Sequence, residues 1–244
     1  MPENGIFCMN IEGGNMLKLV RLEWKKNNIL KYIRIAVITT AILMLFMLMT
    51  AREMETAETV EAYGKSMLNA SVTLVVHMSY MVFTGVMIAA YIVGAYEKKT
   101  INLMFSYPIS RSKIILSKVF AVWIFNVAAM AASKALLYFG LILTKSFTGI
   151  SAEGLWVGKP SFWLDAVLSS VAMVSISFIA LPIGMKMKSS KAAIVAAVII
   201  VCFTQGQIGS VTLVNNMTFY AVLFVAAVAS VWLAVWRVEL RDVM

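Results

Sequence analysis

The polar side chains best placed to do chemistry in this sequence are those that interrupt long apolar runs. Asn126, Lys134 and Asp165 are of this kind, and His77, the one histidine of the chain, lies in another apolar run. A metal site needs several convergent ligands, and an intramembrane hydrolase needs paired Ser/His, His/Glu or Asp groups. Because neither pattern occurs, we predict a non-enzymatic chain without a catalytic or metal site, and we expect His77 to be an ordinary polar residue near the membrane surface.

The sequence does not predict a nucleotide site either. The P-loop motif GxxxxGK[ST] uses its glycines to let backbone N–H groups surround phosphates. Gly64-Lys65-Ser66 matches the end of this motif, but Thr59 occupies the position of its first glycine. We therefore expect the chain to bind no cofactor of its own.

The composition indicates an integral membrane protein. Of the 244 residues, 61% are hydrophobic and 14% are charged, whereas about 25% charged residues are usual in soluble proteins. A soluble domain of this length would have to expose much of that apolar surface. The formal net charge of +9 suits attraction to anionic lipid of the bilayer. We predict no nucleic-acid partner, because no soluble basic module is evident.

The elements that must position the polar residues are membrane-spanning helices. A helix needs about 20 apolar residues to cross roughly 30 Å of hydrocarbon. Because the connections are short, we predict an all-α polytopic membrane protein with a single six-span domain over residues 16–244. The six expected spans are Ile33–Thr50, Ala70–Ala95, Val119–Thr144, Phe162–Ile183, Ala192–Ile208 and Met217–Trp236.

The basic residues predict the orientation of these spans, since Lys and Arg near span ends favour the cytoplasmic side. Most of the 21 Lys and Arg residues lie in the N-terminal segment, the second and fourth loops and the C-terminal tail. The opposite side holds only Arg52, Lys65, Lys145 and Lys159. We therefore expect both termini to be cytoplasmic.

Residues 1–15 form a polar extension without the order of a signal peptide. Glu12-Gly13-Gly14 could be encoded by a purine-rich ribosome-binding sequence in front of a start at Met16. We hypothesise that this extension is not translated in the cell.

A helix is expected to follow the extension. Leu17, Val20 and Trp24 share one helical face. This suits a helix lying in the inner membrane interface, with Trp24, Lys25 and Lys26 as anchors. The alternative is a simple helical extension of the first span.

Lys134 lies near the middle of the third expected span, where an unpaired charge costs at least about 2.5–3.5 kcal/mol. Three explanations stay open: it faces a polar translocation cavity, it pairs with a carboxylate such as Asp165, or it snorkels outward from a tilted helix. We favour a position that faces the bundle interior. Asp165 alternatively is a hydrated residue at the interface, and Asn126 is expected to bridge helices by a hydrogen bond.

The loop after the second expected span carries the most specific pattern. A glutamate leaves the span, a threonine follows three residues later, and a leucine, a Pro-Ile-Ser-Arg run and a lysine lead into the third span. These places are filled by Glu97, Thr100, Leu103, Pro108, Ser110, Arg111 and Lys118, while Lys99 precedes the threonine. In this order, and in its start Met16-Leu17-Lys18, the sequence resembles the type-2 family of ATP-binding-cassette (ABC) transporter permeases, which commonly has glycine in place of Lys99.

The residue types of this loop suit an element that couples the membrane domain to a partner. Pro108 breaks the preceding helix, and Ser110 can cap the helix that follows. Arg111 and Lys118 are expected to stay solvated and available to an acidic partner surface or to lipid, and Glu97 to pair with a loop lysine or contact the partner. The alternative is an ordinary basic loop with a Pro-Ser turn.

The resemblance implies the permease subunit of an ABC exporter in a bacterial plasma membrane. ATP and Mg would be bound by a separate cytoplasmic ATPase subunit, and a second permease copy or a paralogous permease would complete the pathway. Compact permeases of this kind resemble those of lantibiotic immunity and antibiotic resistance, which implies an antimicrobial peptide or a drug as cargo. The alternative is a proton-coupled secondary transporter, which would need more buried carboxylates and repeated halves.

Overall fold

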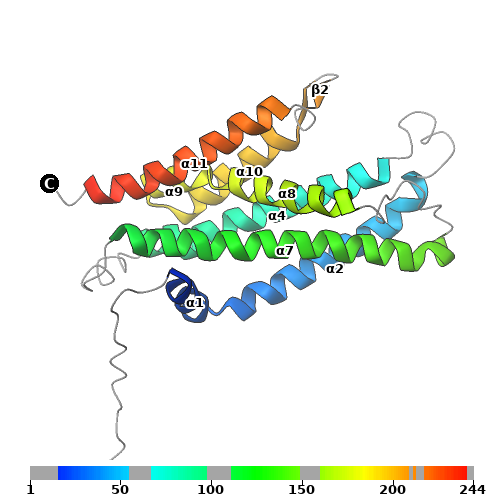
Figure 1. The fold of residues 1–244 in the computed structure, drawn as a ribbon, viewed down its shortest axis with the longest axis horizontal. Coiled ribbons are helices and arrows are strands. Elements are labelled where there is room, and N and C mark those ends of the chain that lie inside the picture. The colour runs from blue at the N-terminus through cyan, green and yellow to red at the C-terminus, as the bar shows by residue number, and fades with distance from the viewer. Residues whose placement is uncertain are drawn as a thin grey trace, which may run out of the picture.

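The computed structural model of the chain describes residues 16–54, 67–97, 111–148, 160–208, 211–212 and 217–240. Most of the described residues are helical, and two short strands pair with each other (Figure 1). The elements in chain order are α1 (Met16–Lys26), α2 (Ile29–Met54), α4 (Met67–Ile88), the π-helical turn η1 (Ala89–Val93), α5 (Gly94–Glu97), α7 (Arg111–Thr148), α8 (Pro160–Ser177), α9 (Ala180–Met187), α10 (Ser190–Gln205), β1 (Gln207–Ile208), β2 (Val211–Thr212) and α11 (Met217–Leu240).

The described helices confirm an all-α polytopic membrane protein. Four helical segments are long and apolar enough to cross a bilayer, and two shorter apolar helices follow them, Ser190–Gln205 and Ala221–Trp236. The four long segments are Ile29–Thr50, Leu68–Glu97, Ser112–Thr144 and Pro160–Met187. The fifth expected span ends earlier than predicted, because the backbone becomes extended at Gly206 and continues into β1, which pairs antiparallel with β2.

The fourth expected span is broken rather than continuous. α8 ends at Ser177, a turn follows at Phe178, and α9 begins at Ala180. Pro182, in the first turn of α9, has no N–H with which to reach the carbonyl of Phe178 four residues earlier. Ser230 of α11 donates its hydroxyl to that carbonyl at 3.0 Å. The break in the fourth span is therefore also a polar attachment point for α11.

The core lies where α4, α7, α8 and α10 meet. Val76, Val122, Val174 and Ala193, one from each of these helices, are fully buried there. Most helices run along the long axis of the molecule, whereas α1 lies across them beside α7 and the start of α2 (Figure 1). One end of the bundle, called the α1 side, thus combines a transverse helix with the ends of the spanning helices.

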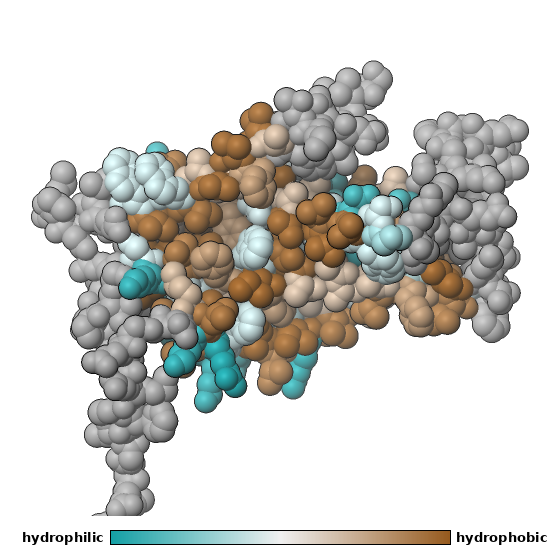
Figure 2. Space-filling view, viewed as in Figure 1, coloured by the Kyte–Doolittle hydropathy of each residue, from teal (hydrophilic) through white to brown (hydrophobic). Residues whose placement is uncertain are grey.

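The outer surface of the bundle is also apolar (Figure 2). Val37, Leu168 and Val225 are each more than 60% exposed. Soluble monomers rarely expose apolar patches of this extent, but lipid tails solvate them without cost. The polar groups that need an explanation are therefore those buried between the helices.

Candidate functional site

The predicted coupling segment is described at its two flanks. Thr100, Leu103, Pro108 and Ser110 lie in residues 98–110, outside the described residues. α5 ends at Glu97 before this segment, and α7 begins at Arg111 after it. The side chain of Arg111 also lies outside the described part. The geometry of this site therefore comes from Glu97 on one flank and Lys118 on the other.

Glu97 is bound to the first residue of α10. Its Oε2 accepts hydrogen bonds from the Ser190 backbone N–H at 3.1 Å and from the Ser190 hydroxyl at 2.6 Å. Helix N-termini leave backbone N–H groups without intrahelical partners, and the helix dipole favours negative charge there. Ser189 caps the same helix by accepting a hydrogen bond from the Ala192 backbone N–H. The carboxylate that precedes the predicted coupling segment thus holds the start of α10.

Lys118 is buried, so the expectation that it stays solvated is wrong. Its side chain is 2% exposed, and Nζ donates to Oε2 of Glu23 at 2.8 Å and to the backbone oxygen of Tyr91 at 3.3 Å. Neither charge could be buried alone at low cost, and the pair with its extra hydrogen bond satisfies both. Tyr91 belongs to η1, and π-helical turns are frequent at functional sites. Lys118 therefore joins α7, α1 and η1.

Glu23 is the residue of this site that the sequence reasoning missed. It is the only acidic residue of α1, and it lies three residues after Val20, hence on the same helical face. A lone carboxylate on the apolar face of a basic helix was the sequence signal from which a buried ion pair could have been predicted. Val20 and Glu23 are buried, whereas Leu17, expected on this face, is 74% exposed.

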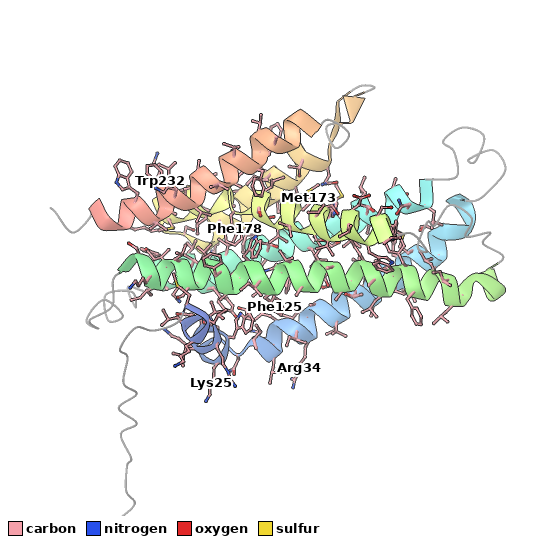
Figure 3. The ribbon with its side chains drawn as sticks, viewed as in Figure 1. Lys25, Arg34, Phe125, Met173, Phe178 and Trp232 are labelled. Atoms are coloured by element: carbon pink, nitrogen blue, oxygen red, sulfur yellow. The ribbon has the colours of Figure 1, made fainter. Side chains whose placement is uncertain are left out.

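Trp24 attaches α1 to the rest of the protein. Its indole N–H donates to the backbone oxygen of Ala121 in α7 at 3.0 Å. Lys25 and Lys26 are exposed, and Lys25 projects away from the bundle (Figure 3). The interfacial role of these three residues stays a prediction, to which the structure adds a contact between Trp24 and the third span.

Lys134 faces the interior of the bundle toward α8. The residue is 1% exposed, and its Nζ donates to Ser169 Oγ at 2.7 Å and to the Ala166 backbone oxygen at 3.2 Å. Asp165 is exposed, and no carboxylate of the described segments lies within ion-pair distance of Lys134. The polar partners of this ammonium group are therefore neutral.

Asn126 and His77 are two further polar residues inside the bundle. The Asn126 side-chain amide donates to the Val122 carbonyl at 2.8 Å and contacts the sulfur of Met87 on α4 at 3.2 Å. His77 is 2% exposed, so its side chain is packed between the helices. Within the described segments neither ring nitrogen of His77 has a hydrogen-bond partner.

The structure separates the predicted site residues into two groups. Lys118 and Lys134 stand sixteen residues apart on α7, which corresponds to about 24 Å of helix rise. One group, around Glu97 and Lys118, lies on the α1 side and links the flanks of the predicted coupling segment to α10 and α1. The other group, around Lys134, lies deeper in the bundle between α7 and α8.

Sequence similarity to known proteins identifies the family of the chain. The model of the family described as "ABC-2 family transporter protein" matches residues 19–204. The chain is 27% identical to "Uncharacterized protein YcbO" of Bacillus subtilis (strain 168) in an alignment of 199 residues that covers 76% of this chain and 82% of that protein. No solved structure matches the chain. Since the family match covers most of its length, the chain belongs to the ABC-2 family of transporter proteins.

Proposed function

We propose that the chain is the permease subunit of an ABC exporter, and that its segment 98–110 receives force from a separate cytoplasmic ATPase subunit. That subunit would bind ATP and Mg, because the sequence of this chain holds no P-loop. Membership of the ABC-2 family supports a membrane permease and, in general, an ABC ATPase partner.

The observation that carries the coupling proposal is the attachment of both flanks of this segment. Glu97, directly before it, is hydrogen-bonded to the start of α10. Lys118, two turns into α7, is paired with Glu23 of α1. A push on the segment would therefore reach the fifth span through one contact and the transverse helix through the other. Charge-assisted contacts of this kind are shorter and roughly twice as strong as neutral hydrogen bonds, which supports them as the route of that displacement.

The finer features of the proposal come from sequence. The basic flanks support cytoplasmic termini, and the family resemblance supports a second permease copy or a paralogous permease. An antimicrobial peptide or a drug is the cargo that the resemblance to immunity and resistance permeases supports.

The proposal is tested by purifying a tagged full-length chain from native membranes. We expect an ABC ATPase subunit to co-purify, with a hydrolysis rate that changes when this chain is removed. Glu97→Ala should leave the complex assembled but abolish the response of hydrolysis to cargo. Lys191→Gln, an exposed neighbour of Ser190, is the matched control and should behave as wild type.

Labelling tests the sidedness independently. Lys113 is exposed in the first turn of α7. In a variant without Cys8 and Cys202, the substitution Lys113→Cys should react with an impermeant maleimide only after the cells are opened. Reaction in intact cells, or purification without any ATPase, would overturn the proposal.

A further inference from the structure

A groove runs along the outside of the bundle between α2 and α7. It has a volume of about 510 Å³, and Tyr80 of α4 contributes to its floor. One wall is α7, where Ala128, Ala129 and Ala132 leave space that larger side chains would fill. The volume lies within the range of roughly 300–1,000 Å³ that is typical of small-molecule sites.

The groove opens toward the lipid and covers about one leaflet. Val37 and Leu136 line it and are 61% and 59% exposed, so it is open sideways. On α2 its lining extends from Ile33 to Met44, which corresponds to about 16 Å of helix rise. Half of a hydrocarbon core of roughly 30 Å is about 15 Å. Because Ile33 lies near the α1 side, the groove belongs to the leaflet on that side.

The polar groups in the floor of the groove are already bonded to one another. Thr40 Oγ1 is hydrogen-bonded to the Ala36 backbone oxygen at 2.9 Å, to Tyr80 OH at 2.9 Å and to Ser133 Oγ at 3.2 Å. The other lining residues are apolar. A polar occupant would lose its hydration here against a lining that is otherwise apolar, so the groove favours a hydrocarbon chain.

The size of the groove favours an acyl chain over a protein helix as its occupant. A helix segment 16 Å long and about 10 Å wide fills roughly 1,300 Å³, which is more than twice the volume present. A whole helix therefore does not fit inside the groove, whereas a single extended acyl chain has a suitable length.

Cations stand at the end of the groove on the α1 side. Arg34 is exposed and precedes the lining residue Ala41 by seven residues, which is close to two helical turns, so both project from the same face. Trp24 binds α7 at Ala121, one turn before the lining residue Phe125. This contact places α1 across the end of the groove. Lys25 and Arg34 project from the same side of the molecule (Figure 3), where Figure 2 shows hydrophilic side chains below an apolar surface.

We propose that the α2–α7 groove binds one acyl chain of an anionic phospholipid from the leaflet on the α1 side. Arg34 and Lys25 bind the headgroup of that lipid, and the alanine wall holds its chain. This site goes beyond the proposed function, because it requires neither ATP nor a partner subunit.

The test is native mass spectrometry of the purified full chain titrated with phosphatidylglycerol and, separately, with phosphatidylcholine of the same acyl chains. We expect the first phosphatidylglycerol to bind about tenfold more tightly, since basic residues near a headgroup favour net negative charge. Arg34→Gln should weaken that binding about fivefold. Ala132→Phe, which fills the groove from an exposed position, should remove the tight site for both lipids.

Two matched variants act as controls. Ala226→Phe lies on the exposed face of α11 and Lys191→Gln on the exposed face of α10, and both should bind phosphatidylglycerol as wild type. Unchanged lipid binding in Ala132→Phe would overturn the site, and equal affinity for the two lipids would overturn its anionic selectivity. Light scattering tests whether a second copy of the protein occupies the groove. If Ala132→Phe converts a dimer into a monomer, the groove holds a second copy and the proposal is wrong.

Discussion

Lys118 of α7 and Glu23 of α1 form a buried ion pair, with Nζ 2.8 Å from Oε2 and the two side chains only 2% and 11% exposed. The two residues are 95 positions apart in sequence. Their contact joins the transverse helix to the third span at the point where Lys118 also binds the Tyr91 carbonyl of η1. The protein therefore uses a charged contact, rather than apolar packing alone, to attach α1.

Removal of one partner of this pair should be strongly destabilising. Lys118→Met leaves the Glu23 carboxylate buried without a counter-charge, which costs about 3–5 kcal/mol. Glu23→Gln combined with Lys118→Met should recover most of that loss. Unfolding of the purified chain by increasing sodium dodecyl sulfate measures the loss of stability in Lys118→Met and its recovery in the double variant. Additive effects of the two substitutions would contradict a direct pair.

The contact between Glu97 and Ser190 should protect the first turn of α10. Ser190→Ala removes one of the two hydrogen bonds to Glu97, and loss of a helix-terminal contact typically costs about 1 kcal/mol. Hydrogen exchange should become faster for the first amides of α10 and stay unchanged in α11. Glu97→Gln should give the same local change. Equal exchange in the wild type and both variants would show that the contact does not form.

Two glycines in adjacent spans should respond in opposite ways to alanine. A Cβ on Gly85 would overlap the Cβ of Ala197 on α10, whereas a Cβ on Gly140 would meet the flexible end of Met44. Gly85→Ala should therefore cost about 1–3 kcal/mol through overpacking, and Ala197→Gly should rescue it. Gly140→Ala, the matched control, should be neutral or slightly stabilising, because alanine favours a helix by about 0.5–1 kcal/mol.

Lys134 should be coupled to Ser169 and independent of Asp165. Its ammonium donates to Ser169 Oγ at 2.7 Å, so Lys134→Met and Ser169→Ala should be non-additive in unfolding experiments. Lys134→Met and Asp165→Asn should add within about 0.3–0.5 kcal/mol. Lys134→Met alone should not lower stability, because it removes a buried charge whose described partners are neutral.

Transport assays separate a functional charge from a structural one. A role for Lys134 in translocation requires Lys134→Met to lose transport while the folded fraction stays unchanged. Non-additive effects of Lys134→Met and Asp165→Asn, in unfolding or in transport, would contradict the structure, in which Lys134 contacts Ser169 and Asp165 is exposed.

Composition and hydropathy were enough to predict a helical chain that lies in a bilayer. With 61% hydrophobic and 14% charged residues, the chain must expose apolar surface, and a backbone in lipid must satisfy its own hydrogen bonds, which helices do. The order Glu97, Thr100, Pro108, Arg111 and Lys118 also pointed to the family that the comparison shows. These conclusions need only local information, since hydropathy and short motifs are read within one segment.

The pairing of the polar residues became known from the packing of the helices. The partner of Lys118 is Glu23, the partner of Glu97 is Ser190, and Lys134 turns to Ser169 rather than to Asp165. The break at Phe178 and the groove beside α2 likewise depend on which helices pack together. Hydropathy shows that a charge is buried, but its partner lies on another helix, and only the packing of the bundle brings the two together.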